Sequence, residues 1–527
     1  MLAIVCGCSQ PADQPPPPQT TMKIDVVELG VADAQRKMIA GELTSRQLTQ
    51  AYLDRIAAID RAGPTLNSVI ELNPSALDDA DRLDAERAAG KTRGPLHGIP
   101  VLLKDNIDIV GMVNSAGSLA LADNRPQQDA FLVGRLRAAG VVILGKTNLS
   151  EWANFRSTHA TSGWSSRGGQ TRNPYVLDRN PCGSSAGTGA AIAASLATVG
   201  VGTETDGSII CPAAINGLVG MKPTVGLVSR NGIIPISVSQ DTAGPMGRTV
   251  ADVAALLNAL TSVDLTDPAG PAAKAHIAPD YLAFLNAGAL AGKRFGLARK
   301  SLGFNADVDA AVERAVATLT AAGAIVVDVK IDGYGSWEGS ELTVLLYEFK
   351  DGLNRYLKSA GIRPASLEEL IQWNDAHRDA AMPWFGQDIF AMAQAKGTLK
   401  DPEYVKARDE ARRLAGEAGL SATLDANRLD ALITPSAGPA WITDPLLGDH
   451  FVGGGAGMAA VARTPSITVP MGDSHGLPLG LSFMGPAYSE AQLIGFAYAF
   501  EQATHARTPP AFLPHLDTSP PKSTDAH

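Results

Sequence analysis

Residues 182–224 read CGSSAGTGAAIAASLATVGVGTETDGSIICPAAINGLVGMKPT, and the rest of the chain is interpreted from this stretch. It carries Ser184 and Ser208 in separate glycine-flanked turns, joined by a run of small residues, 186–198, that can pack closely as a helix. Glycine lets a substrate or another backbone approach closely, and successive N–H groups in such a turn form an anion-binding hollow. The stretch therefore predicts an oxyanion hole or a phosphate cradle. Phosphate is the weaker choice because no GxxxxGK[ST] pattern is present.

Composition and length limit the classes of protein to which the chain can belong. The chain has 527 residues, of which 45% are hydrophobic, so it can build a large core, and its length alone predicts two to four domains. It has 44 basic and 54 acidic residues, a formal net charge of -10, and no basic stripe that could neutralise a nucleic-acid backbone. The chain has no run of 18 or more strongly apolar residues, so no membrane-spanning helix is predicted. Nucleic acid is therefore not expected as a partner.

The N-terminal residues form a segment of their own. Residues 1–21 read MLAIVCGCSQPADQPPPPQTT, in which the run up to Cys8 resembles a bacterial lipobox and the prolines after it predict an extended linker. We therefore predict a lipoprotein-like signal remnant and linker over residues 1–22, a lipid anchor on Cys8 and a location in the cell envelope or periplasm. The apolar run is short and follows no basic residue, so a disordered cytoplasmic tail is the alternative.

The four cysteines do not form a zinc pattern. Cys6 and Cys8 are a close pair, whereas Cys182 and Cys211 stand apart from them and from each other. No metal site is predicted from this spacing. Whether Cys182 and Cys211 pair is left open.

Helical and strand-like segments alternate from residue 23 onward, which is typical of α/β proteins. A capping box at Thr44 opens the first predicted helix, and a buried strand ends at Lys104. Residues 337–413 are predicted to be helical and to cover the site, with prolines as punctuation. The other helices are predicted over residues 74–89, 130–139, 308–321 and 490–504, and the strands over residues 98–103, 141–144, 324–329, 431–433, 466–469 and 481–484.

Amide hydrolysis needs a nucleophile, a base, an acid for the leaving amine and donors for the oxyanion. Histidine is the usual base, and three histidines, His97, His450 and His475, could reach the serine turns in three dimensions. A lysine can replace histidine if burial disfavours its charged form. Lys104 fits that requirement because it follows the apolar run 99–103. A solvated or salt-bridged lysine at a strand end is the structural alternative.

Five motifs together resemble the amidase signature family, in the family's order, with the resemblance running from about residue 24 to residue 511. They are GPLHGIPVLLKDN (94–106), GKTNLSEWA (145–153), GSSAG (183–187), GTETDGSI (202–209) and PAAINGLVGMKPT (212–224). The resemblance implies an α/β fold: a single α/β/α domain around a large mixed, mostly parallel sheet over residues 23–513. The expectation of two to four domains from length is replaced by one domain. Residues 514–527 are predicted to be a disordered tail.

The resemblance also implies a Ser-cisSer-Lys triad. By position, Ser208 matches the nucleophile, Ser184 the serine at an unusual cis peptide bond, and Lys104 the base. Neutral Lys104 would take a proton from Ser184, which takes one from Ser208 as that oxygen attacks the carbonyl. Ser184 would then return a proton to the leaving amine, and water would release the acid.

The resemblance assigns the oxyanion hole to the backbone N–H groups of Thr205, Asp206, Gly207 and Ser208. Ser185 is predicted either to support the site with its hydroxyl or to cap the helix that follows. No cofactor and no metal are implied. The expected partners are an amide or peptide-amide substrate and water, and the oligomeric state is not predicted.

One position departs from the commoner family pattern TDTGGS, because this chain has TETDGS over residues 203–208. The change places the Asp206 carboxylate at the rim of the oxyanion hole. Together with GQTRNPY (169–175) and GLVSRNGIIPIS (226–237), it makes the chain similar to the bacterial peptide amidase branch. That similarity implies hydrolysis of the C-terminal carboxamides of peptides.

Several alternatives compete with this interpretation. Within the same family, the chain could be a general aliphatic or aryl amidase, or the A-type component of a tRNA-dependent amidotransferase with partner subunits. The segment 183–187 also matches G-x-S-x-G, the α/β-hydrolase elbow, with Ser185 as nucleophile. That elbow needs a strand directly before it, which residues 178–181 do not provide. A non-enzymatic binding protein on the same fold is the last alternative.

Overall fold

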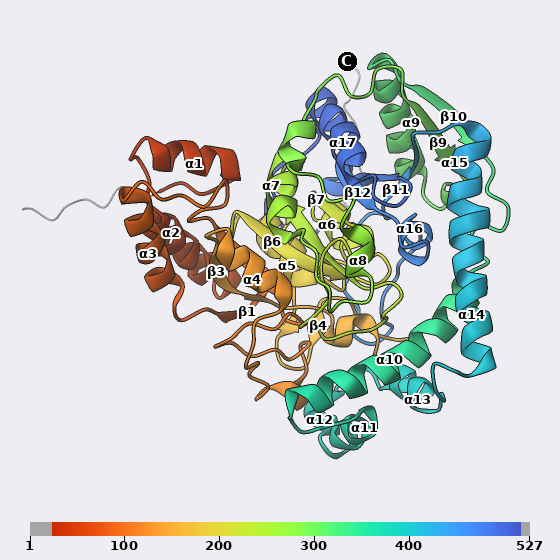
Figure 1. Ribbon diagram of the computed structural model, residues 1–527, viewed down its shortest axis with the longest axis horizontal. Coiled ribbons are helices and arrows are strands. Elements are labelled where there is room, and N and C mark those ends of the chain that lie inside the picture. Colours follow the sequence, from red (N-terminus) through yellow and green to blue (C-terminus); the bar gives the residue numbers. More distant parts are fainter. Residues whose placement is uncertain (1–23, 518–527) are drawn as a thin grey trace, which may run out of the picture.

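The computed structural model describes residues 24–517, so the predicted lipid anchor at Cys8 and most of the predicted C-terminal tail lie outside the described part. An 11-stranded sheet forms the centre of the molecule (Figure 1). In sheet order its strands are β1 (Val69–Leu72), β3 (Val142–Thr147), β2 (Pro100–Lys104), β6 (Val199–Glu204), β8 (Thr242–Gly247), β7 (Val219–Lys222), β12 (Ser466–Ser474), β13 (Leu477–Met484), β11 (Ala431–Pro435), β9 (Arg294–Ala298) and β10 (Ile325–Val329). A separate two-stranded ribbon pairs β4 (Trp164–Ser165) with β5 (Gly169–Gln170).

The sheet is mixed, as predicted. Parallel pairs join β3, β2 and β6 near one end and β11, β9 and β10 at the other. The strands between these blocks pair antiparallel, and so does β1 with β3. Of these ten pairings, four are parallel and six antiparallel, so parallel pairs are fewer than expected.

Helices cover both faces of the sheet and make the predicted α/β/α arrangement. On one face, α5 contacts β6 and β8 while α6 contacts β7, β12 and β13; on the other, α7, α9 and α17 contact the sheet and one another. The bounds of these helices are α5 (Ala186–Ala193), α6 (Ile210–Ile215), α7 (Val250–Leu260), α9 (Ala306–Ala321) and α17 (Glu490–Thr504). The smaller helices are α1 (Val31–Ile39), α2 (Ser45–Arg55), α3 (Ala76–Ala88), α4 (Phe131–Ala138), α8 (Gly270–Ala273), α15 (Ala422–Asn427) and α16 (Gly457–Val461).

A helical arm runs along one side of the sheet, where residues 337–413 were predicted to be helical (Figure 1). It consists of α10 (Glu338–Ala360), α11 (Leu367–Ala376), α12 (Arg378–Ala381), α13 (Asp388–Gln394) and α14 (Pro402–Arg412), continued by a π-helical turn, η6 (Arg413–Ser421). The first turn of α10 reaches the cavity described below, so the arm does border the site. Within residues 24–517, no helix combines the length and the hydropathy that crossing a membrane requires.

Most predicted elements are present, with small shifts at their ends. The capping box at Thr44 is formed, because its side chain accepts from the backbone of Gln47 while the Gln47 side chain accepts from the Thr44 N–H. The helix expected over residues 186–198 is shorter than predicted. It ends at Ala193, Ser195 adopts a positive φ of 55°, and β6 begins at Val199.

Four interior strands of the sheet, β6, β7, β8 and β9, were not predicted. Strand β8 reads TAGPMG, and its two glycines and one proline have low strand propensity. These strands are buried almost throughout, so they show no alternation of apolar and polar residues. Their composition reflects close packing instead. A Cβ at Gly202 of β6 would lie 2.8 Å from the Ser185 hydroxyl oxygen.

Candidate active site

Lys104 is the last residue of β2, and none of its side chain is exposed. Its Nζ lies 2.7 Å from the Ser184 Oγ, 2.9 Å from the Thr203 Oγ1 and 3.1 Å from the Thr203 carbonyl oxygen. Burial lowers the pKa of Lys104 to about 7, and the charges of Glu204 and Asp241 only partly oppose this. A solvated or salt-bridged lysine, the structural alternative, is therefore not what the fold contains. Lys104 can be neutral near pH 7 and hold a proton from Ser184.

Ser184 lies in the turn before α5, and the Gly183–Ser184 peptide bond is cis, as the family resemblance implied. Its hydroxyl is fully buried against Lys104. The carbonyl oxygen of Ser184 accepts from the Ser150 N–H at 3.1 Å, which holds the turn against the segment that follows β3. Ser184 is thus fixed on both its backbone and its side chain.

Ser185 was predicted either to support the site with its hydroxyl or to cap the helix that follows. Its Oγ donates to the Thr203 carbonyl at 3.1 Å and accepts from the Thr203 N–H at 3.2 Å, so the hydroxyl is occupied by β6. It occupies the N-cap position of α5 without a side-chain capping bond. The segment before it is not a strand. Ser185 therefore tethers α5 to β6, and the G-x-S-x-G elbow geometry is not formed.

Ser208 follows β6 in a turn whose shape is set by Glu204 and Gly207. The Glu204 Oε2 accepts from the N–H groups of Ile209 and Ile210 at 2.7 and 3.0 Å, which ties the start of α6 to the end of β6. Gly207 has a φ of 76°, a conformation that favours glycine. The Ser208 side chain is 9% exposed, and its hydroxyl makes no hydrogen bond to residues 24–517. The backbones of the two serine turns adjoin, because the Ser185 N–H donates to the Ser208 carbonyl at 3.2 Å.

The turn between β6 and α6 presents unused hydrogen-bond donors. Among the described residues, the backbone N–H groups of Thr205, Asp206, Gly207 and Ser208 have no acceptor. Successive free N–H groups form the anion-binding hollow that a tetrahedral oxyanion requires. The predicted oxyanion-hole donors and the Lys104–Ser184 pair therefore lie on adjoining segments of the fold.

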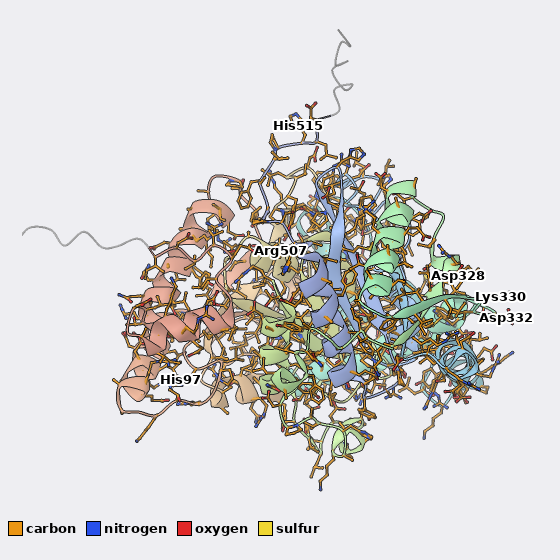
Figure 2. The ribbon with its side chains drawn as sticks, turned by 90° about the horizontal axis from the view of Figure 1, so that it is seen from above. His97, Asp328, Lys330, Asp332, Arg507 and His515 are labelled. Carbon is orange, nitrogen blue, oxygen red and sulfur yellow. A yellow bond between two sulfur atoms is a disulfide. The ribbon has the colours of Figure 1, made fainter. Side chains whose placement is uncertain are left out.

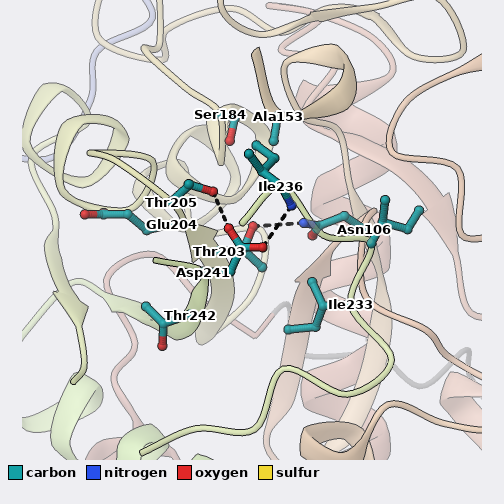
Figure 3. A pocket seen from close by; sticks show the side chains of 11 residues that line it. Asn106, Ala153, Ser184, Thr203, Glu204, Thr205, Ile233, Ile236, Asp241 and Thr242 are labelled. Carbon is teal, nitrogen blue, oxygen red and sulfur yellow. Dashed lines mark hydrogen bonds between the residues drawn. The ribbon is translucent and has the colours of Figure 1, made fainter. Parts of the chain in front are cut away.

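Three residues that support the site, Asn106, Thr203 and Asp241, were not assigned from the sequence (Figure 3). The Asn106 Nδ2 donates to the Thr203 Oγ1 at 2.9 Å, which places this threonine for its contact with Lys104. The Thr205 Oγ1 donates to the Asp241 Oδ1 at 2.6 Å, which fixes the start of the nucleophile turn. Burial raises the pKa of Asp241 to about 6. Asn106 and Thr203 lie inside the quoted motifs, but only the folded contacts reveal their part.

Cys182 and Cys211 form a disulfide, with their Cα atoms 6.0 Å apart. One cysteine lies two residues before Ser184 and the other three residues after Ser208. The bond therefore joins the two serine turns directly. This settles the pairing that the sequence left open.

Two cavities adjoin the serine turns. A small one of about 20 Å³ lies beside Ser184 and is lined by Asn106, Thr203 and three isoleucines of residues 233–236 (Figure 3). A larger one of about 330 Å³ is lined by Gly183 and Gly207, the neighbours of the two serines. Asp206 and the disulfide also line the larger cavity. The first has room for little more than a water molecule, and the second can hold an amino-acid residue or more.

The three histidines considered as bases bond elsewhere. The His97 Nε2 lies 2.9 Å from the Leu83 carbonyl, deep under the N-terminal helices. His450 and His475 are exposed and lie 3.6 and 3.5 Å from Asp444 and Asp307. None of the three lines either cavity. Within residues 24–517, no cluster of His, Cys, Asp and Glu side chains is arranged to hold a metal ion.

Comparisons with known proteins agree with this geometry. The family model described as Amidase matches residues 47–494. A probable amidase of Arabidopsis thaliana is 40% identical over 93% of this chain and 92% of its own length. The structure of native peptide amidase from Stenotrophomonas maltophilia is 55% identical, with a TM-score of 0.89 over 92% of this chain and 99% of that chain. The A-type component of the glutamyl-tRNA(Gln) amidotransferase from Salinispora arenicola is 37% identical over 92% of this chain and 99% of its own length.

Proposed function

This chain belongs to the amidase family, and from that premise we propose that it is a serine amidohydrolase that releases ammonia from the C-terminal carboxamides of peptides. The observation that carries the proposal is the buried contact of 2.7 Å between the Lys104 Nζ and the Ser184 Oγ, beside a turn of free N–H groups. Lys104 is fully buried and can be neutral near pH 7. It is suited to move a proton.

The reaction begins when the Ser208 Oγ attacks the carboxamide carbon, its proton passes to Ser184, and the Ser184 proton passes to neutral Lys104. The backbone N–H groups of residues 205–208 hold the oxyanion. The C–N bond then breaks as Ser184 gives a proton to the nitrogen and takes one back from protonated Lys104, so ammonia leaves and Ser208 carries the acyl group. Water repeats the sequence, releases the acid and restores Ser208.

The two serine hydroxyls are not hydrogen-bonded to each other in this structure. Contacts of this kind often tighten only when substrate is bound. The Ser208 hydroxyl is free to turn toward Ser184, because no other described residue holds it. The proposed proton transfer therefore requires a hydrogen bond between the two hydroxyls to form in the substrate complex.

The choice of peptide amides rests on the larger cavity and on the similarity to peptide amidase. Because the leaving group of a carboxamide is only ammonia, the acyl part must account for most of the bound volume. The cavity of about 330 Å³ suits an amino-acid residue with part of a peptide chain. The test is ammonia release by the isolated chain from peptide amides, amino-acid amides and aryl amides. Turnover of peptide amides by this chain alone supports the proposal over a role in a multi-chain amidotransferase, and turnover of aryl amides alone would replace it with a general amidase.

The rate is expected to rise with pH through about 7, because only neutral Lys104 can accept a proton and its pKa lies at about 7. Below that pH the ammonium form dominates, and kcat/KM should fall roughly ten-fold per pH unit. The measurement is kcat/KM for an uncharged peptide amide between about pH 5 and pH 9. Asp206→Asn is the control, since it removes another group in the pocket and should keep the rising limb. A flat profile, or a limb lost in this variant, would assign the titration to a group other than Lys104.

A location in the cell envelope, with a lipid anchor on Cys8, belongs to the same proposal. The Cys182–Cys211 disulfide supports it, because disulfides persist mainly in oxidising compartments. The test is fractionation of cells that express the full gene with its native upstream sequence. Wild-type protein in the membrane fraction and Cys8→Ser protein outside it are expected, and the same fraction for both would reject the anchor.

A further inference from the structure

The larger cavity is acidic and contains no compensating cation. Four of its lining residues carry carboxylates, Asp206, Glu338, Glu341 and Asp449, and none is lysine, arginine or histidine. Among residues 24–517, none of these four carboxylates forms a salt bridge. Glu341 is buried and Asp449 half-buried, whereas Asp206 and Glu338 are exposed. A buried carboxylate is normally paired, so Glu341 is unusual for a purely structural wall.

The four carboxylates differ in how well the protein satisfies them. Asp449 accepts from the Ser162 N–H at 2.9 Å and the Ser162 Oγ at 2.5 Å, and from the Trp441 indole N–H at 3.2 Å. Asp206 accepts no hydrogen bond from the described residues, although its side chain faces the cavity. Asp449 therefore belongs to the wall, and Asp206 is open to a ligand.

Glu341, in the first turn of α10, is 5% exposed. Its Oε1 accepts from the Gln240 Nε2 at 2.7 Å, while its Oε2 has no donor among the described residues and lines the cavity. Buried carboxylate oxygens normally accept hydrogen bonds, so the free Oε2 of Glu341 lacks a donor that a ligand could supply. Glu338, one turn earlier, is exposed at the rim and also carries no ion pair among the described residues.

These carboxylates repel one another. Asp206 is exposed toward the cavity, where desolvation is the main cause that raises its pKa; the charges of Glu204 and Glu338 add to it, against Lys222. Burial also raises the pKa of Glu341, with Asp206 as the second cause. A cation placed between Asp206 and Glu341 would relieve this repulsion. The lining of the cavity does not supply one.

Aromatic rings complete the wall. Trp337 and Tyr334 line the cavity and pack edge to face, with ring centroids 5.6 Å apart. The Trp337 ring and the Asp206 carboxylate meet at Gly457, because a Cβ there would lie 3.4 Å from the Asp206 Oδ1 and 3.7 Å from the Trp337 Nε1. Glycine keeps this corner open. Carboxylates together with an aromatic ring are the groups that bind organic cations.

We propose that this cavity binds a cationic group of the substrate's acyl part, a protonated amine or a guanidinium, between Asp206, Glu341 and Trp337. The inference rests on the proposed function, which places the acyl part in the larger cavity. The cation is organic, since the described acidic residues are not arranged to hold a metal ion. The chain is thus an amidase selective for cationic amides. The charge comes from a basic side chain or from a free α-amine next to the carboxamide.

Three substrates of matched carbon skeleton distinguish these sources. N-acetyl-lysinamide carries a side-chain ammonium, norleucinamide carries an α-ammonium, and N-acetyl-norleucinamide is neutral. At about pH 8 the lysine side chain and part of the α-amine are protonated. We expect kcat/KM for at least one cationic amide to exceed that of the neutral amide by about ten-fold or more, as for a partly buried ion pair. Equal values for all three would overturn the inference but leave the proposed function intact.

The variants Asp206→Asn and Glu341→Gln test whether these carboxylates cause the preference. Each should reduce the cationic-to-neutral ratio about ten-fold, with the loss mainly in KM. The matched control is Asp332→Asn, which removes the same charge from an exposed edge of the molecule (Figure 2). A preference that survives in both cavity variants, or falls equally in Asp332→Asn, would reject the assignment.

A binding measurement keeps the test independent of turnover. Titration calorimetry on the Ser208→Ala variant should show benzamidinium binding at least about ten-fold more tightly than the isosteric neutral benzamide. The same ratio should approach one when Glu341→Gln is added. Equal affinities in the parent variant would contradict the cation site even if no amide is hydrolysed. Ammonia release neither from the three amides nor from a longer peptide amide would instead refute the proposed function.

Discussion

Ser208→Ala is expected to lower kcat by about 10⁴-fold or more, because the oxygen that attacks the carboxamide is lost and no neighbouring group replaces it. The Ser208 hydroxyl makes no hydrogen bond to the described residues, so its removal should leave the fold intact. Ammonia release from a peptide amide gives the rate. Circular dichroism and thermal unfolding check the fold.

Ser185→Ala is the matched control for this variant. It removes the neighbouring hydroxyl of the serine pair, which bonds both the N–H and the carbonyl of Thr203. We expect a loss of about 1 kcal/mol in the free energy of unfolding and a far smaller loss of activity than for Ser208→Ala. Ordinary activity in Ser208→Ala with inactive Ser185→Ala would support the hydrolase elbow instead.

Lys104→Met is expected to lower kcat by about 10³-fold or more, since it keeps the apolar stem but removes the base. Lys104→Arg should be nearly as damaging, because the guanidinium stays protonated and cannot accept a proton. Methionine also avoids placing a permanent charge in a fully buried site. Single-turnover rates measured at about pH 9 show whether the loss persists where wild-type Lys104 is neutral, so that a shift of the pH profile alone cannot explain it.

Lys146→Met tests whether the loss of activity in Lys104→Met comes from the missing base or only from removing a buried lysine. Lys146 is fully buried on the neighbouring strand β3, opposite Leu103, and its Nζ lies 3.1 Å from Asp105. Its replacement leaves the buried Asp105 carboxylate with one cation, Arg167 at 3.2 Å, and removes the donor to the Ile107 carbonyl, so it should cost roughly 1 to 3 kcal/mol of stability. Activity per folded molecule should nevertheless stay well above that of Lys104→Met. Similar losses in both variants, once corrected for folding, would deny Lys104 a special role.

The sequence was sufficient for the residues that the family motifs contain. Lys104, Ser184 and the Ser208 turn could be placed because each stands in a short motif with a recognisable order, and the fold brings the first two into contact. Helices with caps or clear periodicity, such as α2 and α17, were also predictable. In these cases the local signal and the tertiary structure agree.

Other features depend on contacts between distant segments. Strand β8 was missed because its glycines serve close packing against β7 and α7, which propensity does not report. Glu341 lies 133 residues after Ser208 on a helix that was predicted only as a cover, so its place in the cavity could not be foreseen. The partner of Ser185 could not be foreseen either. Its hydroxyl is taken up by Thr203, a contact that requires the absence of a side chain at Gly202.

The most direct test of the proposed mechanism is to identify the serine that becomes covalently modified. The protein is treated with a sulfonyl fluoride reagent with and without excess peptide amide, digested, and analysed by tandem mass spectrometry. The mechanism predicts one adduct on Ser208, slowed by substrate and absent from Ser208→Ala. Modification of Ser185, or of Ser184 with Ser208 untouched, would contradict it.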